Sequence, residues 1–232
     1  MRVHVAFTPA EEVAAPVGIV VDVLRATSTI VQALASGYRR VLCCGSVEEA
    51  RALRDRSPDG VVLAGERRCV RIPGFDLGNS PREFLEPEGE TVVLTTTNGT
   101  RALVTAAERC DVVLAASLVN LEAVVAAARE ADEDVVVLCA GVKGEFTLDD
   151  AFCAGRIVER LGGELSDGAA AAIRLSASFG TPEDGLRSSR SARNLVAAGL
   201  DDDIAWCARE SVLDVVPRVS GIDAGTVEIV RA

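Results

Sequence analysis

The hydrophobic residues of the chain fall into two alternating patterns. Short runs dominated by Val, Ile and Leu are typical of strands buried on both faces. Longer segments with apolar residues three or four positions apart have the spacing of amphipathic helices. The short runs predict strands at 3–7, 19–23, 41–44, 61–64, 91–95, 112–115, 134–139, 213–216 and 227–230. The spaced segments predict a helix that ends at Gly37 and further helices at 46–56, 81–85, 100–108, 121–129, 148–161, 167–178, 182–198 and 204–209.

This alternation predicts an α/β protein, a three-layer α/β/α fold with a mainly parallel sheet covered on both faces. At 232 residues the chain is long enough for one large domain or two small ones. The segments 19–37 and 135–162 both read as strand, loop and helix, which suggests two similar halves. We expect an N-terminal half, 1–118, and a C-terminal half, 119–232, packed as one unit with a functional site between them.

The segment 17–37 carries the first group of polar residues that could take part in binding or catalysis. Asp22 and Arg25 follow its buried-type strand, and three hydroxyl-bearing residues come next, Thr27, Ser28 and Thr29. Gly37 suits the end of a helix, where the backbone commonly adopts a positive φ. Carboxylate, guanidinium and hydroxyl groups beside the free N–H groups of a helix N-terminus favour an anion, a metal ion or both. The alternative is an ordinary helix cap without a ligand.

Two similar loops follow later strands. Their polar residues are Thr97, Asn98, Gly99 and Thr100 in the second loop, and Lys143 and Glu145 in the third, which precedes a helix opening with Asp149 and Asp150. Glu66 follows another predicted strand, and the polar segment 67–79 leads to a short helix. Because ligands bind beyond the carboxyl ends of parallel strands, we expect the three loops and Glu66 to meet in one crevice.

Composition narrows the class of protein. The formal charge of −11 argues against nucleic acid as a partner. The seven cysteines are scattered without a C-x-x-C pair, which favours a reducing compartment. No secretory signal pattern is seen at the N-terminus, and no apolar run approaches the roughly 20 residues that span a bilayer. We therefore expect a cytoplasmic protein that binds neither nucleic acid nor membranes, with a homo-oligomer as an open possibility.

The available side chains restrict the chemistry. The only histidine, His4, lies in a predicted strand, so Ser-His-Asp and Cys-His mechanisms are disfavoured. The fingerprints of dinucleotide-binding loops, P-loops and zinc sites are missing from the sequence. Carboxylates, hydroxyls and amides remain, and oxygen ligands of this kind suit Mg²⁺. Phosphoryl transfer to water uses such a set most naturally, because cations and N–H groups stabilise the charge of the transition state.

Several sequence blocks carry a family resemblance. They are Asp22-Val-Leu-Arg-Ala-Thr-Ser-Thr-Ile30, Gly65-Glu66, Gly74-Phe-Asp-Leu-Gly-Asn-Ser-Pro81, Thr95-Thr-Thr-Asn-Gly-Thr100 and Ala140-Gly-Val-Lys-Gly-Glu-Phe-Thr-Leu-Asp-Asp150. From about residue 17 to its end, the chain resembles the 2-phosphosulfolactate phosphatase (ComB) family. The resemblance implies a Mg²⁺-dependent phosphatase that hydrolyses 2-phospho-3-sulfolactate, a small anionic substrate, in an α/β fold of two similar halves. In archaeal members this step belongs to the route to coenzyme M.

On this resemblance we assign roles as hypotheses. The catalytic residues are predicted to be Asp22, Arg25, Glu66 and Lys143, and the metal ligands Asp22 and Glu66 with Asp149 or Asp150. The predicted substrate-binding residues are Thr27, Ser28, Thr29, Asn79, Ser80, Thr97, Asn98, Gly99, Thr100 and Glu145, with Arg71 as a further donor. Asp150 has an alternative role in a capping box with Thr147. Direct attack by water and an aspartyl-phosphate intermediate both stay open, with water favoured.

Two rival functions also stay open. The first is a phosphatase acting on another small phosphorylated hydroxy acid. The second is a protein that binds a phosphorylated metabolite without hydrolysing it, a role with less need of several acids at strand ends. Phosphate release with and without EDTA separates enzyme from binding protein, and a panel of phosphomonoesters separates the substrates.

Overall fold

A computed structural model describes residues 1–56 and 59–232 of the chain. Its described part contains one sheet of eleven strands in the order β5-β4-β6-β3-β11-β10-β7-β2-β8-β1-β9. The strands are β1 (Arg2–Ala6), β2 (Val17–Val21), β3 (Arg40–Cys43), β4 (Val61–Arg67), β5 (Val70–Arg71), β6 (Thr91–Thr95), β7 (Val112–Ala116), β8 (Val135–Cys139), β9 (Glu164–Leu165), β10 (Pro217–Asp223) and β11 (Thr226–Arg231).

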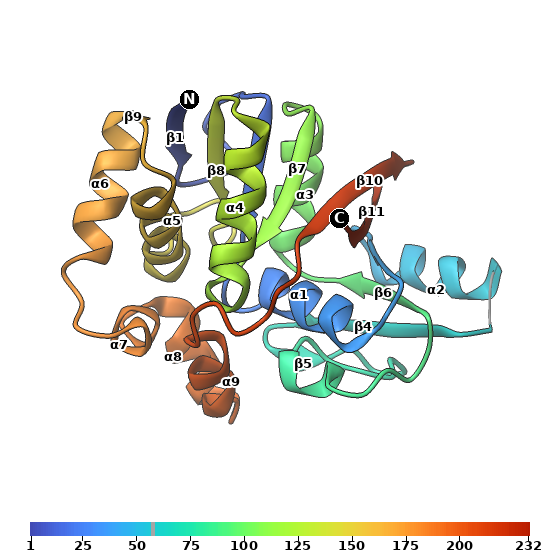
Figure 1. Cartoon of the computed structure of the whole chain (residues 1–232). Helices are drawn as coiled ribbons and strands as arrows, with labels where there is room; N and C mark the ends of the chain where they lie inside the picture. Colours follow the sequence, from blue (N-terminus) through green and yellow to red (C-terminus); the bar gives the residue numbers. More distant parts are fainter. Residues whose placement is uncertain (57–58) are drawn as a thin grey trace.

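The sheet consists of two parallel blocks joined by an antiparallel hairpin. Strands β9, β1, β8, β2 and β7 form one block, and β4, β6 and β3 form the other. Each step through β10 and β11 is antiparallel, so β3 and β7 run in opposite directions. In Figure 1, β7 and β8 stand upright, whereas β4 and β6 lie across the view. The two blocks are therefore rotated relative to one another, and this rotation lets the carboxyl ends of their strands approach. In a flat sheet whose two blocks run in opposite directions, these ends would lie at opposite edges.

Helices cover both faces of the sheet, as predicted. They are α1 (Ala26–Ser36), α2 (Val47–Arg56), α3 (Gly99–Ala107), α4 (Leu121–Ala131), α5 (Leu148–Leu161), α6 (Asp167–Ser176), α7 (Pro182–Arg187), α8 (Arg190–Ala197) and α9 (Asp201–Cys207), with the 3₁₀ helices η1 (Pro81–Phe84) and η2 (Leu118–Asn120). In β2 the side chains of Ile19 and Val21 pack with α4 and α5, and Val20 packs with α1 and α3. The alternation of side chains along a strand therefore explains why β2 is apolar throughout.

Local sequence signals placed several elements well. Gly37 has a φ of 112° and its N–H donates to the last carbonyls of α1, as expected of a helix-ending glycine. Ser80 and Glu83 form the predicted capping box of η1, with Pro81 at the first helical position. Helix α5 has the predicted bounds, 148–161.

The structure corrects the predicted elements of the tail. The predicted helix 182–198 is two helices, because the Ser189 side chain caps α8 by accepting the N–H of Ala192 at 3.0 Å. The predicted strand 213–216 is irregular, and the strand β10 begins at Pro217 instead. The N–H of Leu213 donates to the carbonyl of Val119 in η2, so the start of this segment is held by the 3₁₀ helix.

Two more differences concern the sheet. Strand β4 continues through Glu66 to Arg67, and the predicted irregular segment contains β5, which pairs back onto β4. The division into halves 1–118 and 119–232 stays a prediction, with strands from both ranges side by side in one sheet. Among the helices in the described ranges, none is both long and apolar enough to cross a membrane.

Candidate active site

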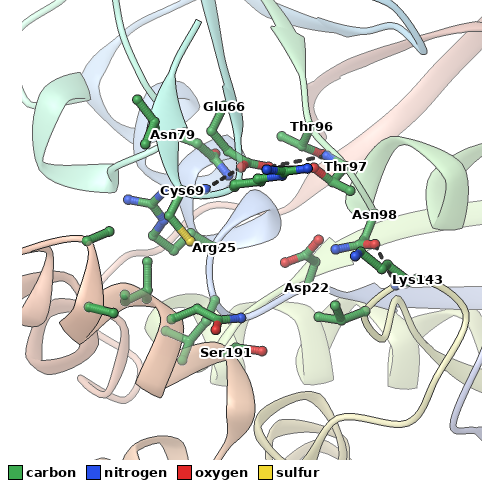
Figure 2. A pocket seen from close by; sticks show the side chains of 18 residues that line it. Asp22, Arg25, Glu66, Cys69, Asn79, Thr96, Thr97, Asn98, Lys143 and Ser191 are labelled. Carbon is green, nitrogen blue, oxygen red and sulfur yellow. Dashed lines mark hydrogen bonds between the residues drawn. The ribbon is translucent and has the colours of Figure 1, made fainter.

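One cavity of about 530 Å³ lies where the two blocks meet. Its polar lining comes from distant parts of the chain: Asp22, Arg25, Glu66, Arg68, Cys69, Asn79, Thr96, Thr97, Asn98, Lys143, Ser191 and Asn194. Figure 2 shows these side chains around a common space, with Asp22 near its centre. The three loops and Glu66 therefore do meet, as the strand pattern predicted, and Asp22, Glu66, Asn98 and Lys143 share the cavity.

Asp22 follows β2 and is 8% exposed. Its Oδ1 accepts the N–H of Ala26 at 3.2 Å, at the start of α1. Burial raises the pKa of its carboxyl to about 7, and the negative charges of Asp149 and Glu66 act in the same direction. An ionised Asp22 is thus unfavourable in the protein alone, which is the situation that a bound cation would relieve.

The hydroxyls after Asp22 face the interior and not the cavity. Thr27 Oγ1 accepts the backbone N–H of Asp22, and Ser28 Oγ donates to the carbonyl of Val23. Thr29 Oγ1 donates to the carbonyl of Asn79 at 3.0 Å. None of the three side chains is among the cavity-lining residues. They fix the path of the loop, and a substrate-binding role for them stays a prediction.

The start of α3 is the clearest anion site. Its N-cap residue, Asn98, makes no capping hydrogen bond with its side chain, so the first N–H groups of the helix lack that partner. The buried Oγ1 atoms of Thr96 and Thr100 also have no partner among the described residues. A Cβ at Gly99 would lie 2.8 Å from Asp22 Oδ2 and 2.5 Å from the Cβ of Ala26, so only glycine permits this approach. Free N–H groups and the helix dipole favour an anion here.

Glu66, near the end of β4, faces the second loop, which follows the neighbouring strand β6. Its Oε2 accepts the N–H of Cys69 at 2.8 Å, and its Oε1 accepts the hydroxyl of Thr97 at 3.0 Å. Burial raises the pKa of the neighbouring Cys69 thiol, so this sulfur stays protonated. Oε1 also accepts the N–H of Thr97 at 3.3 Å, so the remaining acceptor capacity of Glu66 lies on Oε2.

The third loop reaches the cavity through one residue of the prediction and not the other. Lys143 lines the cavity, and its backbone N–H donates to Asn98 Oδ1 at 3.0 Å. Glu145 does not line it, and its carboxylate pairs with Arg190 at 2.8 Å. The loop therefore contributes its lysine and orients Asn98.

Asp149 and Asp150 are buried behind the cavity and do not line it. Asp150 accepts hydrogen bonds from the N–H groups of Val23 and Gly141 and from the hydroxyl of Thr147, and thereby ties the first loop to the third. Asp149 accepts the hydroxyl of Ser191 at 3.1 Å. The contact with Thr147 agrees with the capping alternative, and metal binding by either acid stays a prediction.

One residue beside the cavity, Asp203 of α9, was not predicted from the sequence. Arg25 is 4% exposed, and its Nη1 donates to Asp203 Oδ2 of α9 at 2.6 Å. The other oxygen, Asp203 Oδ1, accepts the hydroxyl of Ser80 at 2.6 Å. Ser80 therefore supports Asp203 and does not line the cavity, whereas Asn79 does. Asp203 lies in the run Asp201–Asp203, which reads locally as the acidic first turn of a helix, so no sequence signal singled it out.

Helix α8 forms a wall that was also not predicted. Its face toward the cavity carries Ser191, Asn194 and Leu195, with Ala197 and Ala198 at its end. Arg68, in the polar segment 67–79, also lines the cavity. Arg71 is not among the lining residues, and its guanidinium donates to the carbonyl of Asp76.

Mg²⁺ prefers oxygen ligands, and several oxygen donors surround the cavity. Within residues 1–56 and 59–232, no three His, Cys, Asp or Glu side chains are grouped so as to hold a metal ion alone. Mg²⁺ usually takes one or two carboxylates and completes its shell with water and substrate phosphate. Asp22 and Glu66 supply two carboxylates, and the buried oxygens of Thr96 and Asn79 are unpartnered. These residues fit Mg²⁺ in ligand type.

Comparison with known proteins gives a consistent result. A family model described as 2-phosphosulpholactate phosphatase matches residues 4–221. A relative from Thermus thermophilus is 42% identical over 229 residues, 95% of each chain. One from Thermotoga maritima is 40% identical over 225 residues, 95% of this chain and 96% of the relative. One from Deinococcus radiodurans is 42% identical over 208 residues, 87% of this chain and 86% of the relative. All three are named probable 2-phosphosulfolactate phosphatases.

Proposed function

The chain belongs to the 2-phosphosulfolactate phosphatase family, and we propose that it hydrolyses 2-phospho-3-sulfolactate to 3-sulfolactate and inorganic phosphate in a Mg²⁺-dependent reaction. It is a phosphoric monoester hydrolase. The observation that carries the proposal is the uncapped N-terminus of α3 beside the buried carboxylate of Asp22 in one cavity. An anion site in contact with an acid suits a phosphate ester held together with a cation.

In this proposal the phosphoryl group binds at the start of α3. The free N–H groups around Gly99 and the hydroxyls of Thr96 and Thr100 take its oxygens. Lys143 adds positive charge from the adjacent third loop, where its backbone N–H donates to Asn98 Oδ1 and the residue lines the same cavity. Fixed N–H dipoles and a cation stabilise the charge that develops on the phosphoryl oxygens in the transition state.

Asp22 and Glu66 would hold Mg²⁺ in this cavity. The metal supplies Lewis-acid polarisation of the phosphate and lowers the pKa of water. Asp22 is oriented by the N–H of Ala26, and Glu66 by Cys69 and Thr97, so both carboxylates keep their positions without the substrate. Such orientation limits the reorganisation needed during the reaction.

We propose direct attack by water on phosphorus, with cleavage of the bond from phosphorus to the C2 oxygen of the substrate. The alternative is an aspartyl phosphate on Asp22. Both oxygens of Asp22 lie against backbone, Oδ1 on the N–H of Ala26 and Oδ2 against Gly99, which favours an orienting role over a nucleophilic one. The stereochemistry at phosphorus distinguishes the two routes, because direct attack by water inverts an isotopically chiral phosphoryl group, whereas two displacements through an aspartyl phosphate retain its configuration.

The test is phosphate release by the purified protein. We expect release from 2-phosphosulfolactate with Mg²⁺ and none with EDTA, with activity restored by excess Mg²⁺. A panel of other phosphorylated hydroxy acids run in parallel defines the preference. Tight binding of 2-phosphosulfolactate without release would contradict the proposal and favour a binding protein. Faster turnover of another ester would keep the enzyme class and change the substrate.

A further inference from the structure

Arg25 and Asp203 form a buried ion pair at the edge of the cavity. The two side chains are 3% and 1% exposed, and their closest atoms are 2.6 Å apart. A buried pair of charges often contributes little to stability, because removing both charges from water costs about as much as their attraction returns. Stability of the fold therefore does not explain why these two charges are buried together.

The geometry of Arg25 suggests one. Arginine carries five N–H donors in a planar fork, and only Nη1 has an acceptor among the described residues. The remaining donors belong to a side chain that lines the cavity. Asp203 is itself held by the hydroxyl of Ser80, so the chain Ser80–Asp203–Arg25 fixes the guanidinium from behind. A rigid guanidinium with free donors is suited to binding an anion.

This anion site is separate from the start of α3. In Figure 2, Asp22 lies between Arg25 on one side and Asn98 with Lys143 on the other. Asn79 lies on the same side as Arg25, is 5% exposed and has no hydrogen-bond partner for its Oδ1 among the described residues. The cavity thus has a polar end at α3 and a second one at Arg25, on either side of the central carboxylate.

We propose that Arg25, positioned by Asp203, forms a second anion subsite that binds an acidic group on the carbon skeleton of the substrate. The inference rests on the proposed function, because 2-phosphosulfolactate carries a sulfonate and a carboxylate besides its phosphate. Asp203 acts as a positioning residue and Arg25 contacts the substrate. This subsite selects esters that bear such an acid, and the phosphoryl group stays at α3.

The experiment compares three phosphate esters on the full chain with Mg²⁺. They are 2-phosphosulfolactate, 2-phospholactate, which lacks the sulfonate, and the phosphate ester of 2-hydroxypropane-1-sulfonate, which lacks the carboxylate. The variant is Asp203→Asn, which keeps the shape and removes the charge. Asp202→Asn is the matched control, because Asp202 is the preceding residue of α9 and, among the described residues, pairs with the exposed Arg82.

We expect Asp203→Asn to lower kcat/KM for 2-phosphosulfolactate by about 10- to 100-fold, as for a misaligned charge-assisted hydrogen bond, mainly through KM. For the ester that lacks the acid bound by Arg25, kcat/KM should fall much less. Which of the two shortened esters behaves in this way identifies whether the sulfonate or the carboxylate occupies the subsite. Ser80→Ala gives a smaller change in the same direction. Asp202→Asn keeps the wild-type ratios. If Asp203→Asn fails to fold, the double variant Arg25→Met with Asp203→Leu, which removes both charges, is expected to lose the same discrimination.

An equal loss on all three esters would overturn the inference, since it would indicate a structural role or a role in phosphoryl transfer. Wild-type protein that hydrolyses all three esters equally well would overturn the second subsite alone. Wild-type protein that hydrolyses none of them would overturn the proposed function, and the subsite with it.

Discussion

Replacing Asp22 with Asn should stabilise the metal-free protein while abolishing its activity. The asparagine keeps the oxygen that accepts the N–H of Ala26 and removes the carboxylate charge from a buried position. The folded state raises the pKa of Asp22 from 3.8 to about 7, chiefly by burial. Between these values the folded protein holds more protons than the unfolded chain, so its stability falls as pH rises.

The size of the effect follows from that shift. A displacement of about 3 pKa units corresponds to a ceiling of about 4 kcal/mol, at about 1.4 kcal/mol for each unit. The stabilisation that the raised pKa of Asp22 gives to the folded wild-type protein is fully present below pH 3.8 and is lost between pH 3.8 and about 7. Above pH 7 it does not change further. The stability difference between Asp22→Asn and wild type should therefore grow over this range and then level off.

Urea denaturation in EDTA at several pH values from 4 to 8 measures this difference. The exposed substitution Asp202→Asn is the control and should run parallel to wild type. Phosphate release with Mg²⁺ checks that Asp22→Asn is inactive. Parallel curves for Asp22→Asn and wild type would refute the reasoning, because they would mean that Asp22 titrates alike in the folded and unfolded states.

Three further results are expected. Gly99→Ala should lower phosphatase activity and destabilise the protein by about 1–3 kcal/mol in urea, because the new methyl group would overlap with the Cβ of Ala26. Asp150→Ala should destabilise by about 2–4 kcal/mol in thermal or urea unfolding, since it leaves two backbone N–H groups unpaired, and Asp150→Asn should cost less. Glu66→Gln should raise the Mg²⁺ concentration for half-maximal activity by at least about tenfold, whereas the exposed Glu90→Gln should not; an unchanged Mg²⁺ titration would remove Glu66 as a ligand.

Much of the site could be predicted because its parts are local. Asp22, Asn98 and Lys143 each follow a strand recognisable from its apolar run, and the helix after each loop is recognisable from its spacing. The rule that ligands bind at carboxyl ends of strands then brought these loops together in the prediction. In the structure the loops meet for a different reason. The two blocks run in opposite directions, since β3 and β7 do, and their carboxyl ends approach because the blocks are rotated relative to one another.

Other features depended on distant contacts. Ser28 and Lys143 are both polar residues in loops, yet the first is buried against Ser117 and the second lines the cavity. Asp201, Asp202 and Asp203 are equivalent in sequence pattern, and only Asp203 reaches Arg25. A carboxylate that lines the cavity, as Asp22 does, and one that braces two loops, as Asp150 does, have the same local signature.

The sequence by itself determined the α/β class, most strands and helices, the family and the loops whose residues line the cavity. These follow from periodicity, caps and motifs, which depend on residues only a few positions apart. The tertiary structure alone decided the two-block sheet, the wall formed by α8 and the link from Asp203 to Arg25. Those features depend on which side chains meet after the chain has folded, and contacts between residues more than a hundred positions apart leave no periodic trace in the sequence.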